Sequence, residues 1–259
     1  MTAVTTTIDG AIAVIRVDNP PVNALSDVVL DGLVAALGSI PPSPEVRAVV
    51  LTGTGKKAFL AGADLSEFVA MVDSPGRIGD HVARTRRVLD ELARLDVPVI
   101  AAVQGLALGG GLEFALACDL IVADETVRLG CPEVRLGLIP GAGGTQRLVT
   151  LLGRFRAAEL IMTGRLLSAG EAAELGLVTR VTKAGSAFDE AVGLANDLAA
   201  APAVAVQAAK RAVRTADALS LPAALELERR EFLATLASDD AREGLGAFLA
   251  KRPPAFTHR

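Results

Sequence analysis

The stretch VPVIAAVQGLALGGGLEFALAC, from Val97 to Cys118, decides the fold class of this chain. Its segment Val99–Val103 is short, apolar and rich in β-branched residues, which predicts a buried strand. Gly105–Gly111 follows and predicts a turn, and Leu112–Ala117 predicts the start of a helix. The stretch therefore predicts a strand, a turn and a helix in succession.

Glu113 is the single formal charge between Asp96 and Asp119. It follows the glycines 109–111, whose backbone N–H groups no side chain shields from a ligand. At a helix N-terminus such N–H groups lack partners and attract negative charge. An apolar setting raises the pKa of a carboxyl group, so Glu113 could exchange protons near neutral pH. The stretch is equally typical of a first-turn helix acid behind glycines that only allow tight packing.

Composition excludes several kinds of partner. The 259 residues allow one or two domains, and a hydrophobic fraction of 51% allows a sizeable core. The net charge is −4 and the chain has neither Trp nor Tyr, so we expect no nucleic-acid partner. The two histidines, His81 and His258, are too few for a His-rich metal site, so we expect no metal.

The cysteines and the N-terminus bear on localisation. Cys118 and Cys131 do not make a disulfide framework and are more typical of buried apolar residues than of nucleophiles, which predicts a cytoplasmic protein. The N-terminus has no basic region followed by an apolar core, so we expect no signal peptide. The most apolar run, Val97–Cys118, contains Gln104, Glu113 and several glycines, so we expect no membrane span.

Outside the central stretch, predicted strands and helices alternate. Asp9-Gly10 is a hairpin signal, Ser26 a helix N-cap signal, and Ser168 with Glu171 fits a capping box. Strands separated by helices indicate βαβ units and an α/β fold. The predicted strands are Val4–Ile8, Ala11–Val17, Ala48–Thr52, Val99–Val103, Leu120–Ala123 and Val178–Val181; helices are predicted from Ser26 to Gly38 and over much of Ile78–Leu95, and loops over Gly53–Gly62 and Pro132–Gly144.

The C-terminal part has a different pattern. From Ala187 onward the sequence is helical and rich in alanine, with Pro202 and Pro222 near helix starts. We therefore divide the chain into a core, residues 1–199, and a helical region, residues 200–259.

Two further segments combine small residues with an acid. Ala61-Gly62-Ala63-Asp64 offers a ligand another approach to bare backbone, or is an ordinary strand-to-helix turn. Glu133 follows Pro132 and precedes IPGAGGTQR, residues 139–147, and it could also be a solvated loop acid. The chain has no Gly-x-x-x-x-Gly-Lys-Ser/Thr phosphate loop, no Gly-x-Ser-x-Gly elbow and no Gly-x-Gly-x-x-Gly fingerprint.

Taken together, these segments resemble the enoyl-CoA hydratase/isomerase family, also called the crotonase family. The resemblance covers nearly the whole chain, and the order and spacing of the motifs carry it. The matching segments are Asn19–Leu25, Lys57–Asp64, Ala102–Glu113, Cys118-Asp119, Pro132-Glu133, Pro140–Arg147 and Glu243–Pro253.

The resemblance implies a spiral of βαβ units with a helical C-terminal trimerisation region, hence a homotrimer or a dimer of trimers. It implies an acyl-CoA thioester as substrate and no cofactor beyond the CoA that the substrate carries. The oxyanion-hole amides of the family map to Ala63 and Gly110, its catalytic glutamates to Glu113 and Glu133, and its water-holding glycine to Gly141. For substrate binding it implies Ala61, Gly62, Asp64 and Leu65, with Lys56, Lys57 and Lys251 near the CoA phosphates and Phe248 near the adenine.

The presence of both glutamates favours the hydratase branch of the family. The expected reaction is reversible syn addition of water to trans-2-enoyl-CoA, giving 3-hydroxyacyl-CoA. A Δ3-Δ2 enoyl-CoA isomerase, which shuttles a proton with one glutamate, is the alternative within the family. A catalytically silent acyl-CoA-binding protein is the alternative from another class.

Overall fold

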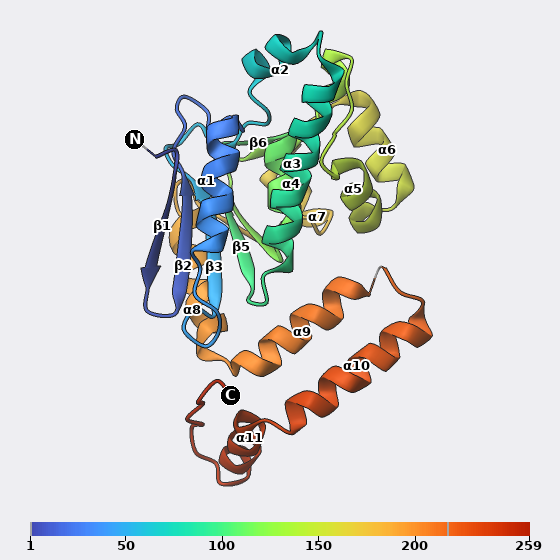
Figure 1. Cartoon of the computed structure of the whole chain (residues 1–259). Helices are drawn as coiled ribbons and strands as arrows, with labels where there is room; N and C mark the ends of the chain where they lie inside the picture. Colours follow the sequence, from blue (N-terminus) through green and yellow to red (C-terminus); the bar gives the residue numbers. More distant parts are fainter. Residues whose placement is uncertain (1, 217) are drawn as a thin grey trace.

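The computed structural model of the chain describes residues 2–216 and 218–259 and is built on two β-sheets (Figure 1). The larger sheet has six strands in the order β1-β2-β3-β5-β7-β10. Its first two strands form an antiparallel hairpin, as predicted, but the turn residues are Gly10-Ala11, one position later than the Asp9-Gly10 signal; the other pairs are parallel. The strands are β1 (Val4–Asp9), β2 (Ile12–Val17), β3 (Ala48–Gly53), β5 (Val99–Val103), β7 (Leu120–Asp124) and β10 (Arg180–Thr182).

The smaller sheet has four very short strands in the order β4-β6-β8-β9. The first three pair in parallel, and β9 pairs antiparallel to β8. The chain alternates between the sheets, from β3 to β4, from β5 to β6 and from β7 to β8, which produces the expected spiral of strand–helix units. The strands are β4 (Ala58–Leu60), β6 (Leu106–Leu108), β8 (Arg128–Gly130) and β9 (Leu167–Ser168).

Helices cover both faces of the larger sheet. Two hydrophobic cores lie on the two faces of this sheet, and alternate residues of β3 point to opposite faces. Val49 and Leu51 belong to the larger core, and Ala48 and Val50 belong to the smaller core, which also contains residues of α8. The helices of the core are α1 (Asp27–Gly38), α2 (Leu65–Met71), α3 (Pro75–Arg94), α4 (Gly110–Ala117), α5 (Gly144–Leu152), α6 (Arg154–Thr163), α7 (Ala169–Glu174) and α8 (Ala187–Ala200), with the 3-10 helix η1 (Glu133–Leu136).

Local signals set several helix starts. The Ser26 side chain accepts a hydrogen bond from Val29 N at the start of α1. Ser168 and Glu171 form the reciprocal capping box that the sequence predicted for α7. Asp64 caps α2 by accepting a hydrogen bond from Ser66 N.

Three predicted loops or turns were wrong in part. The turn over Gly105–Gly111 contains β6, and α4 begins at Gly110 rather than at Leu112. The loop over Gly53–Gly62 contains β4, and that over Pro132–Gly144 contains η1. These elements have three or four residues each, too few to show a hydrophobic period. The last strand of the larger sheet begins at Arg180, two residues later than predicted.

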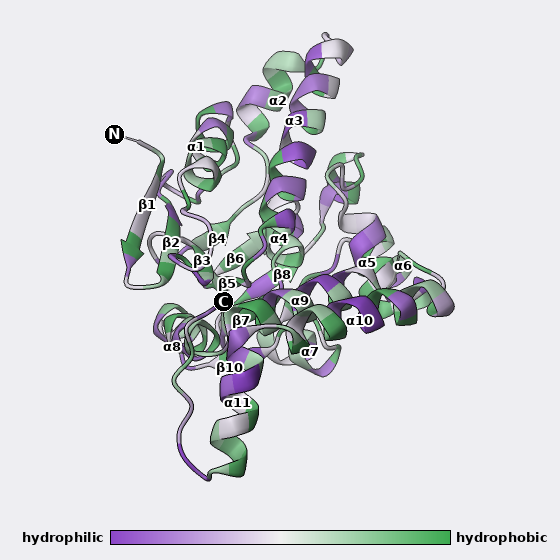
Figure 2. Cartoon of the chain, turned by 60° about the horizontal axis from the view of Figure 1, so that its bottom comes forward, coloured by the Kyte–Doolittle hydropathy of each residue, from purple (hydrophilic) through white to green (hydrophobic). Residues whose placement is uncertain are grey.

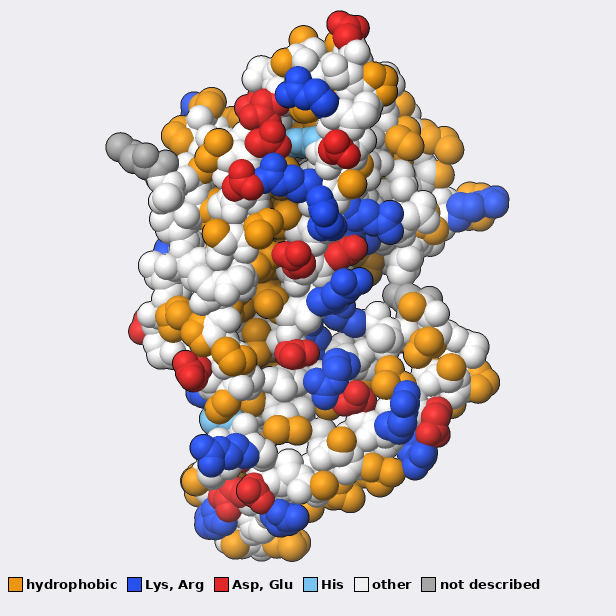
Figure 3. All heavy atoms as spheres, in the orientation of Figure 1, with side chains coloured by type: hydrophobic (Ala, Val, Ile, Leu, Met, Phe, Trp, Pro, Cys, Tyr) orange, Lys and Arg blue, Asp and Glu red, His pale blue; other side chains and the backbone are white. Residues whose placement is uncertain are grey.

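The C-terminal helices α9 (Ala203–Thr215), α10 (Leu221–Leu236) and α11 (Asp239–Leu249) form an arm beside the core (Figure 1). Lys210 Nζ ties α9 to the core, 2.7 Å from Asp119 Oδ2 and 2.7 Å from the Val97 carbonyl oxygen. The arm mixes hydrophobic and hydrophilic segments (Figure 2), and hydrophobic side chains lie at its surface (Figure 3). The division at residue 200 remains a prediction.

No single helix within residues 2–216 and 218–259 is long and apolar enough to cross a membrane. The pair α8 and α9 passes that test together, with a bend of 112° between the two helices.

Candidate active site

A cavity of about 440 Å³ lies where the parallel strands of the smaller sheet end. The segments that follow β4, β6 and β8 all reach it, because the carboxyl ends of parallel strands meet at one edge of a sheet. The segment after β4 brings Ala61–Ala63, the segment after β6 brings Gly109, Gly110 and Glu113, and the segment after β8 brings Pro132 and Glu133. The three segments singled out in the sequence therefore line one cavity.

Two backbone N–H groups lie close together in the wall of the cavity. Leu25 bridges the segment after β4, since its N–H donates to Gly62 O and its carbonyl accepts from Asp64 N. This pairing leaves the Ala63 N–H on the opposite side of the segment. Gly110 begins α4, where its N–H has no helical partner. A Cβ on Gly110 would lie 3.9 Å from Ala63 N, so the two amides are neighbours.

Glu113 lies in the first turn of α4, only 3% exposed. Its Oε1 accepts hydrogen bonds from Ala142 N at 2.8 Å and Gly144 N at 2.7 Å. Burial raises the pKa of Glu113 above its ordinary value, and the N–H groups of Gly144 and Ala142 and the charge of Arg147 act against that rise. The result is a carboxyl group that is held in one orientation and can exchange a proton.

Glu133 begins η1 and points its carboxyl group at the backbone of Gly109. Its Oε2 is buried and accepts no hydrogen bond from the residues that the structure describes. Burial raises the pKa of Glu133, and the neighbouring Glu113 raises it further. Two acids of raised pKa that face one cavity are typical of a site for proton transfer.

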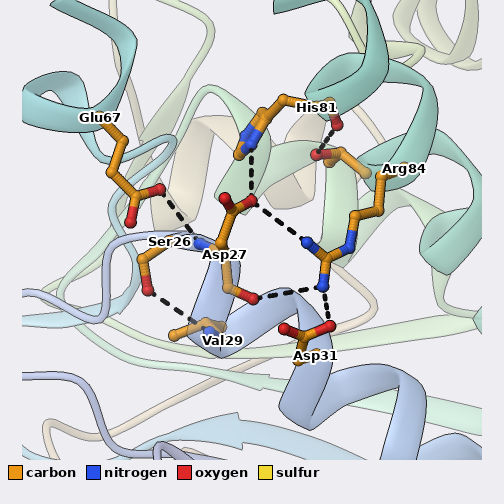
Figure 4. A network of polar contacts seen from close by, with 8 residues as sticks. Ser26, Asp27, Val29, Asp31, Glu67, His81 and Arg84 are labelled. Atoms are coloured by element: carbon orange, nitrogen blue, oxygen red, sulfur yellow. Dashed lines mark hydrogen bonds and ion pairs between the residues drawn. The ribbon is translucent and has the colours of Figure 1, made fainter. Parts of the chain in front are cut away.

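Helices α2 and α3 supply the opposite wall. Phe68, Ile78 and Val82 make it mainly apolar, and His81 and Thr85 add two polar side chains to it. Figure 4 shows that His81 Nδ1 faces Asp27 Oδ1, at 3.1 Å, and that Arg84 reaches the same carboxylate from one turn further along α3. Nδ1 is therefore the ring nitrogen through which His81 contacts the start of α1.

Asp27, Glu67 and His81 bring one potential metal ligand atom each within 4.8 Å of one another. The donor set suits a metal ion poorly. Arg84 pairs with the Asp27 oxygen that His81 contacts, and Glu67 Oε2 accepts a hydrogen bond from Asp27 N. A cation would have to compete with the Arg84 guanidinium group and with the hydrogen bond from Asp27 N to Glu67.

Only some of the residues that were expected to bind substrate line the cavity. Ala61, Gly62 and Leu65 line the cavity, whereas the Asp64 side chain turns to Ser66 as a helix cap. The remaining candidates lie outside the cavity lining: Lys56 and Lys57 are exposed before β4, Phe248 is 81% exposed on α11, and Lys251 follows that helix with a φ of +50°.

Several site residues escaped the sequence reasoning. The α3 wall with His81 and Thr85 carries no motif. The N–H groups of Ala142 and Gly144, which hold Glu113, belong to the family-matching segment Pro140–Arg147, but the sequence predicted no contact between that segment and Glu113; the paired glycines Gly143-Gly144 were the signal available there. Gly141 lines the cavity beside Val82.

Known proteins that are similar to this chain in sequence and structure include enoyl-CoA hydratases. Residues 7–259 match the family model described as enoyl-CoA hydratase/isomerase. The chain is 38% identical over 249 residues to the short-chain-enoyl-CoA hydratase of Clostridium acetobutylicum, covering 94% of this chain and 93% of the relative. The crystal structure of enoyl-CoA hydratase from Bacillus anthracis superposes with a TM-score of 0.94 at 38% identity, covering 99% of this chain and 100% of the other. The chain belongs to the enoyl-CoA hydratase/isomerase family.

Proposed function

We propose that this protein is an enoyl-CoA hydratase, a hydro-lyase that adds water reversibly and syn across the double bond of trans-2-enoyl-CoA to give 3-hydroxyacyl-CoA. The observation that carries the proposal is the meeting of two glutamates, Glu113 and Glu133, with the amides of Ala63 and Gly110 at one mainly apolar cavity. Relatives named enoyl-CoA hydratase support it.

The two amides would act on the thioester carbonyl. Attack of water at C3 moves an electron pair onto the thioester oxygen and forms an enolate. The N–H groups of Ala63 and Gly110 would donate to that oxygen as its charge grows. Loss of one such donor costs about 3 kcal/mol of transition-state stabilisation in comparable sites.

The two acids would divide the proton transfers. Glu113, held by two N–H groups, would accept a proton from the attacking water as the C3–O bond forms. Glu133, whose raised pKa suits a proton donor, would deliver a proton to C2 as the enolate collapses. Gly141, which lines the cavity beside Val82, would help to hold the water. This proton chemistry needs no metal or redox cofactor, and CoA belongs to the substrate.

The CoA moiety would extend out of the cavity toward cationic groups. Lys56 and Lys57 are the candidates near β4, and Phe248 and Lys251 the candidates on the arm. Exposed hydrophobic side chains on α10 and α11, among them Phe232, support a homotrimer or a dimer of trimers, in which these faces would be covered. The two free thiols suit the reducing cytoplasm, where we propose that the enzyme acts.

Purified protein with crotonyl-CoA tests the proposal. We expect loss of the conjugated enoyl absorbance and a product heavier by one water. A 3-enoyl-CoA substrate distinguishes the isomerase, which would yield the 2-enoyl isomer with no change in mass. Binding of crotonyl-CoA without turnover would contradict the proposed activity and favour a silent acyl-CoA-binding protein.

A further inference from the structure

The loop between η1 and α5 holds the carboxylate of Glu113 through two N–H groups that flank one peptide. The N–H of Ala142 belongs to the peptide before residue 142, and the N–H of Gly144 to the peptide after residue 143. The peptide between them, which joins Ala142 to Gly143, must turn its carbonyl away from Glu113 for both neighbours to donate inward. Whatever fixes that carbonyl therefore fixes both hydrogen bonds to Glu113.

Arg147 fixes it. Its Nη1 donates to the Ala142 carbonyl oxygen at 3.0 Å, and its own backbone N–H donates to Gly143 O at 2.9 Å, so one residue binds both carbonyls of the turn. The guanidinium lies directly on Gly143, where any Cβ would collide with Nη1, and Gly143 has a φ of +116°. Gly143 thus leaves room for the arginine as well as for the turn.

Arg147 is also tied to the wall of the cavity. Its Nη2 lies 4.0 Å from Asp90 Oδ1 on α3, the helix that supplies Val82 and His81 to that wall. The charged and titratable groups that surround Glu113 and Arg147 are Glu133 from η1, Cys131 from the segment after β8, His81, Arg86 and Asp90 from α3, and Arg214 from α9.

We propose that Arg147 is a positioning residue for the base Glu113: by holding the Ala142 carbonyl it aims the N–H groups of Ala142 and Gly144 at the carboxylate. The inference rests on the proposed function only for the role of Glu113 as a base. The positive charge of Arg147 also opposes the effect of burial on the pKa of Glu113, so the arginine keeps the base available at lower pH.

Substitution by lysine separates the orienting effect of Arg147 on Glu113 from the effect of its positive charge. It retains a positive charge but lacks the planar guanidinium that can reach the Ala142 carbonyl and Asp90 at once. Arg147→Lys is therefore expected to disturb the orientation of Glu113 more than its ionisation, and Arg147→Gln to disturb both. Arg156→Gln on the exposed face of α6 makes the same change in net charge and is the matched control.

The experiment compares these three variants with the parent by the pH dependence of kcat and kcat/KM on crotonyl-CoA, and by thermal unfolding. A second measurement follows the carboxyl carbon of Glu113 by NMR titration of ¹³C-labelled protein, with Glu113→Gln to assign the signal. We expect kcat to fall about 100-fold in Arg147→Gln with little change in KM. The acidic limb of the profile and the titration of Glu113 should both move to higher pH, and Arg156→Gln should match the parent.

Two results would overturn the inference. One is an Arg147→Gln variant with kcat within twofold of the parent. The other is a loss of kcat in both Arg147 variants with no change in the titration of Glu113, since a merely structural role predicts that pattern. If the parent does not hydrate crotonyl-CoA, the proposed function fails, and the NMR titration still decides whether Arg147 controls Glu113.

Discussion

Gly109 lies against the carboxyl group of Glu133 so closely that a Cβ on the glycine would sit 2.6 Å from Glu133 Oε1. The same glycine has a φ of +51° and accepts the Glu113 N–H at its carbonyl. A single residue without a side chain therefore allows α4 to start, with Glu113 in its first turn, directly beside the second acid.

Gly109→Ala tests this relationship. We expect it to displace Glu133 and lower kcat on crotonyl-CoA about 100-fold, because a small misplacement of a catalytic group has an effect of that order. Gly10→Ala is the control, since Gly10 has a similar φ of +56° and no atom within 4 Å of an added Cβ. Gly10→Ala should lose about 1 kcal/mol of stability to backbone strain and keep its activity, whereas Gly109→Ala should lose more stability and also lose activity. Equal activity in the two variants would show that Glu133 does not depend on the glycine.

The two acids themselves are the next test. Glu113→Gln and Glu133→Gln keep the size of the side chain and remove its proton transfer, so each is expected to lower kcat by about three decades while CoA-ester binding survives. The double variant should lose less than the sum of the two losses, because both acids serve one reaction. An isomerase that uses Glu133 alone would give a different result: Glu113→Gln would keep most of its activity on a 3-enoyl substrate.

The sequence predicted the longer elements around this site and missed the shortest ones. Ser26, Asp64 and the Ser168–Glu171 box mark helix starts through contacts within a few residues. In the larger sheet, β2, β3, β5 and β7 are mainly apolar runs of five or six residues, which the sequence shows. The strands β4, β6 and β8 have three residues each and were missed. Their pairing is what brings the segments after them to one edge.

The contacts around the acids could not be predicted for a second reason. Glu113 and Ala142 are joined by a hydrogen bond between α4 and a distant loop, and Arg147 reaches back over that loop to α3. No local propensity encodes such contacts. The family resemblance singled out Glu133 and Gly110, which line the cavity, but it carried no information about His81, which reaches the cavity only because α3 crosses it.

Metal removal is expected to leave the activity unchanged. The ligand atoms of Asp27, Glu67 and His81 converge, but Arg84 pairs with Asp27 Oδ1 and the Asp27 N–H donates to Glu67 Oε2, so a cation would compete with both contacts. Dialysis against EDTA, followed by the crotonyl-CoA assay, checks this. A loss of rate that Mg²⁺ or Zn²⁺ restores in the parent and not in Glu67→Gln would identify the cluster as a metal site.

The ion pair between Lys210 and Asp119 should control the attachment of α9 to the core. Both side chains are largely buried, and Asp119 Oδ2 also accepts the Val99 N–H. Lys210→Met leaves the carboxylate without its cation and is expected to cost about 3 kcal/mol in the free energy of unfolding by urea. Lys183→Met, on an exposed lysine, is the control. The double variant with Asp119→Asn should be more stable than Lys210→Met alone; a double variant that is less stable would contradict the pairing.

The stability of the fold should depend on pH through Glu133. Burial and the neighbouring Glu113 raise its pKa above the ordinary value of 4.5, so between that value and the raised one the folded protein binds more protons than the unfolded chain. Stability contributed by this residue is therefore complete below pH 4.5 and declines as the pH rises through the folded pKa. The glutamine of Glu133→Gln does not ionise, so the stability of this variant does not decline in that way. Its stability relative to the parent should therefore grow with pH, with a Tm about 2 °C higher at neutral pH. Thermal unfolding from about pH 4 to about pH 8, with Glu45→Gln at an exposed site as control, measures this; a gain that shrinks with rising pH would mean that the Glu133 carboxylate is stabilised, not penalised, in the folded protein.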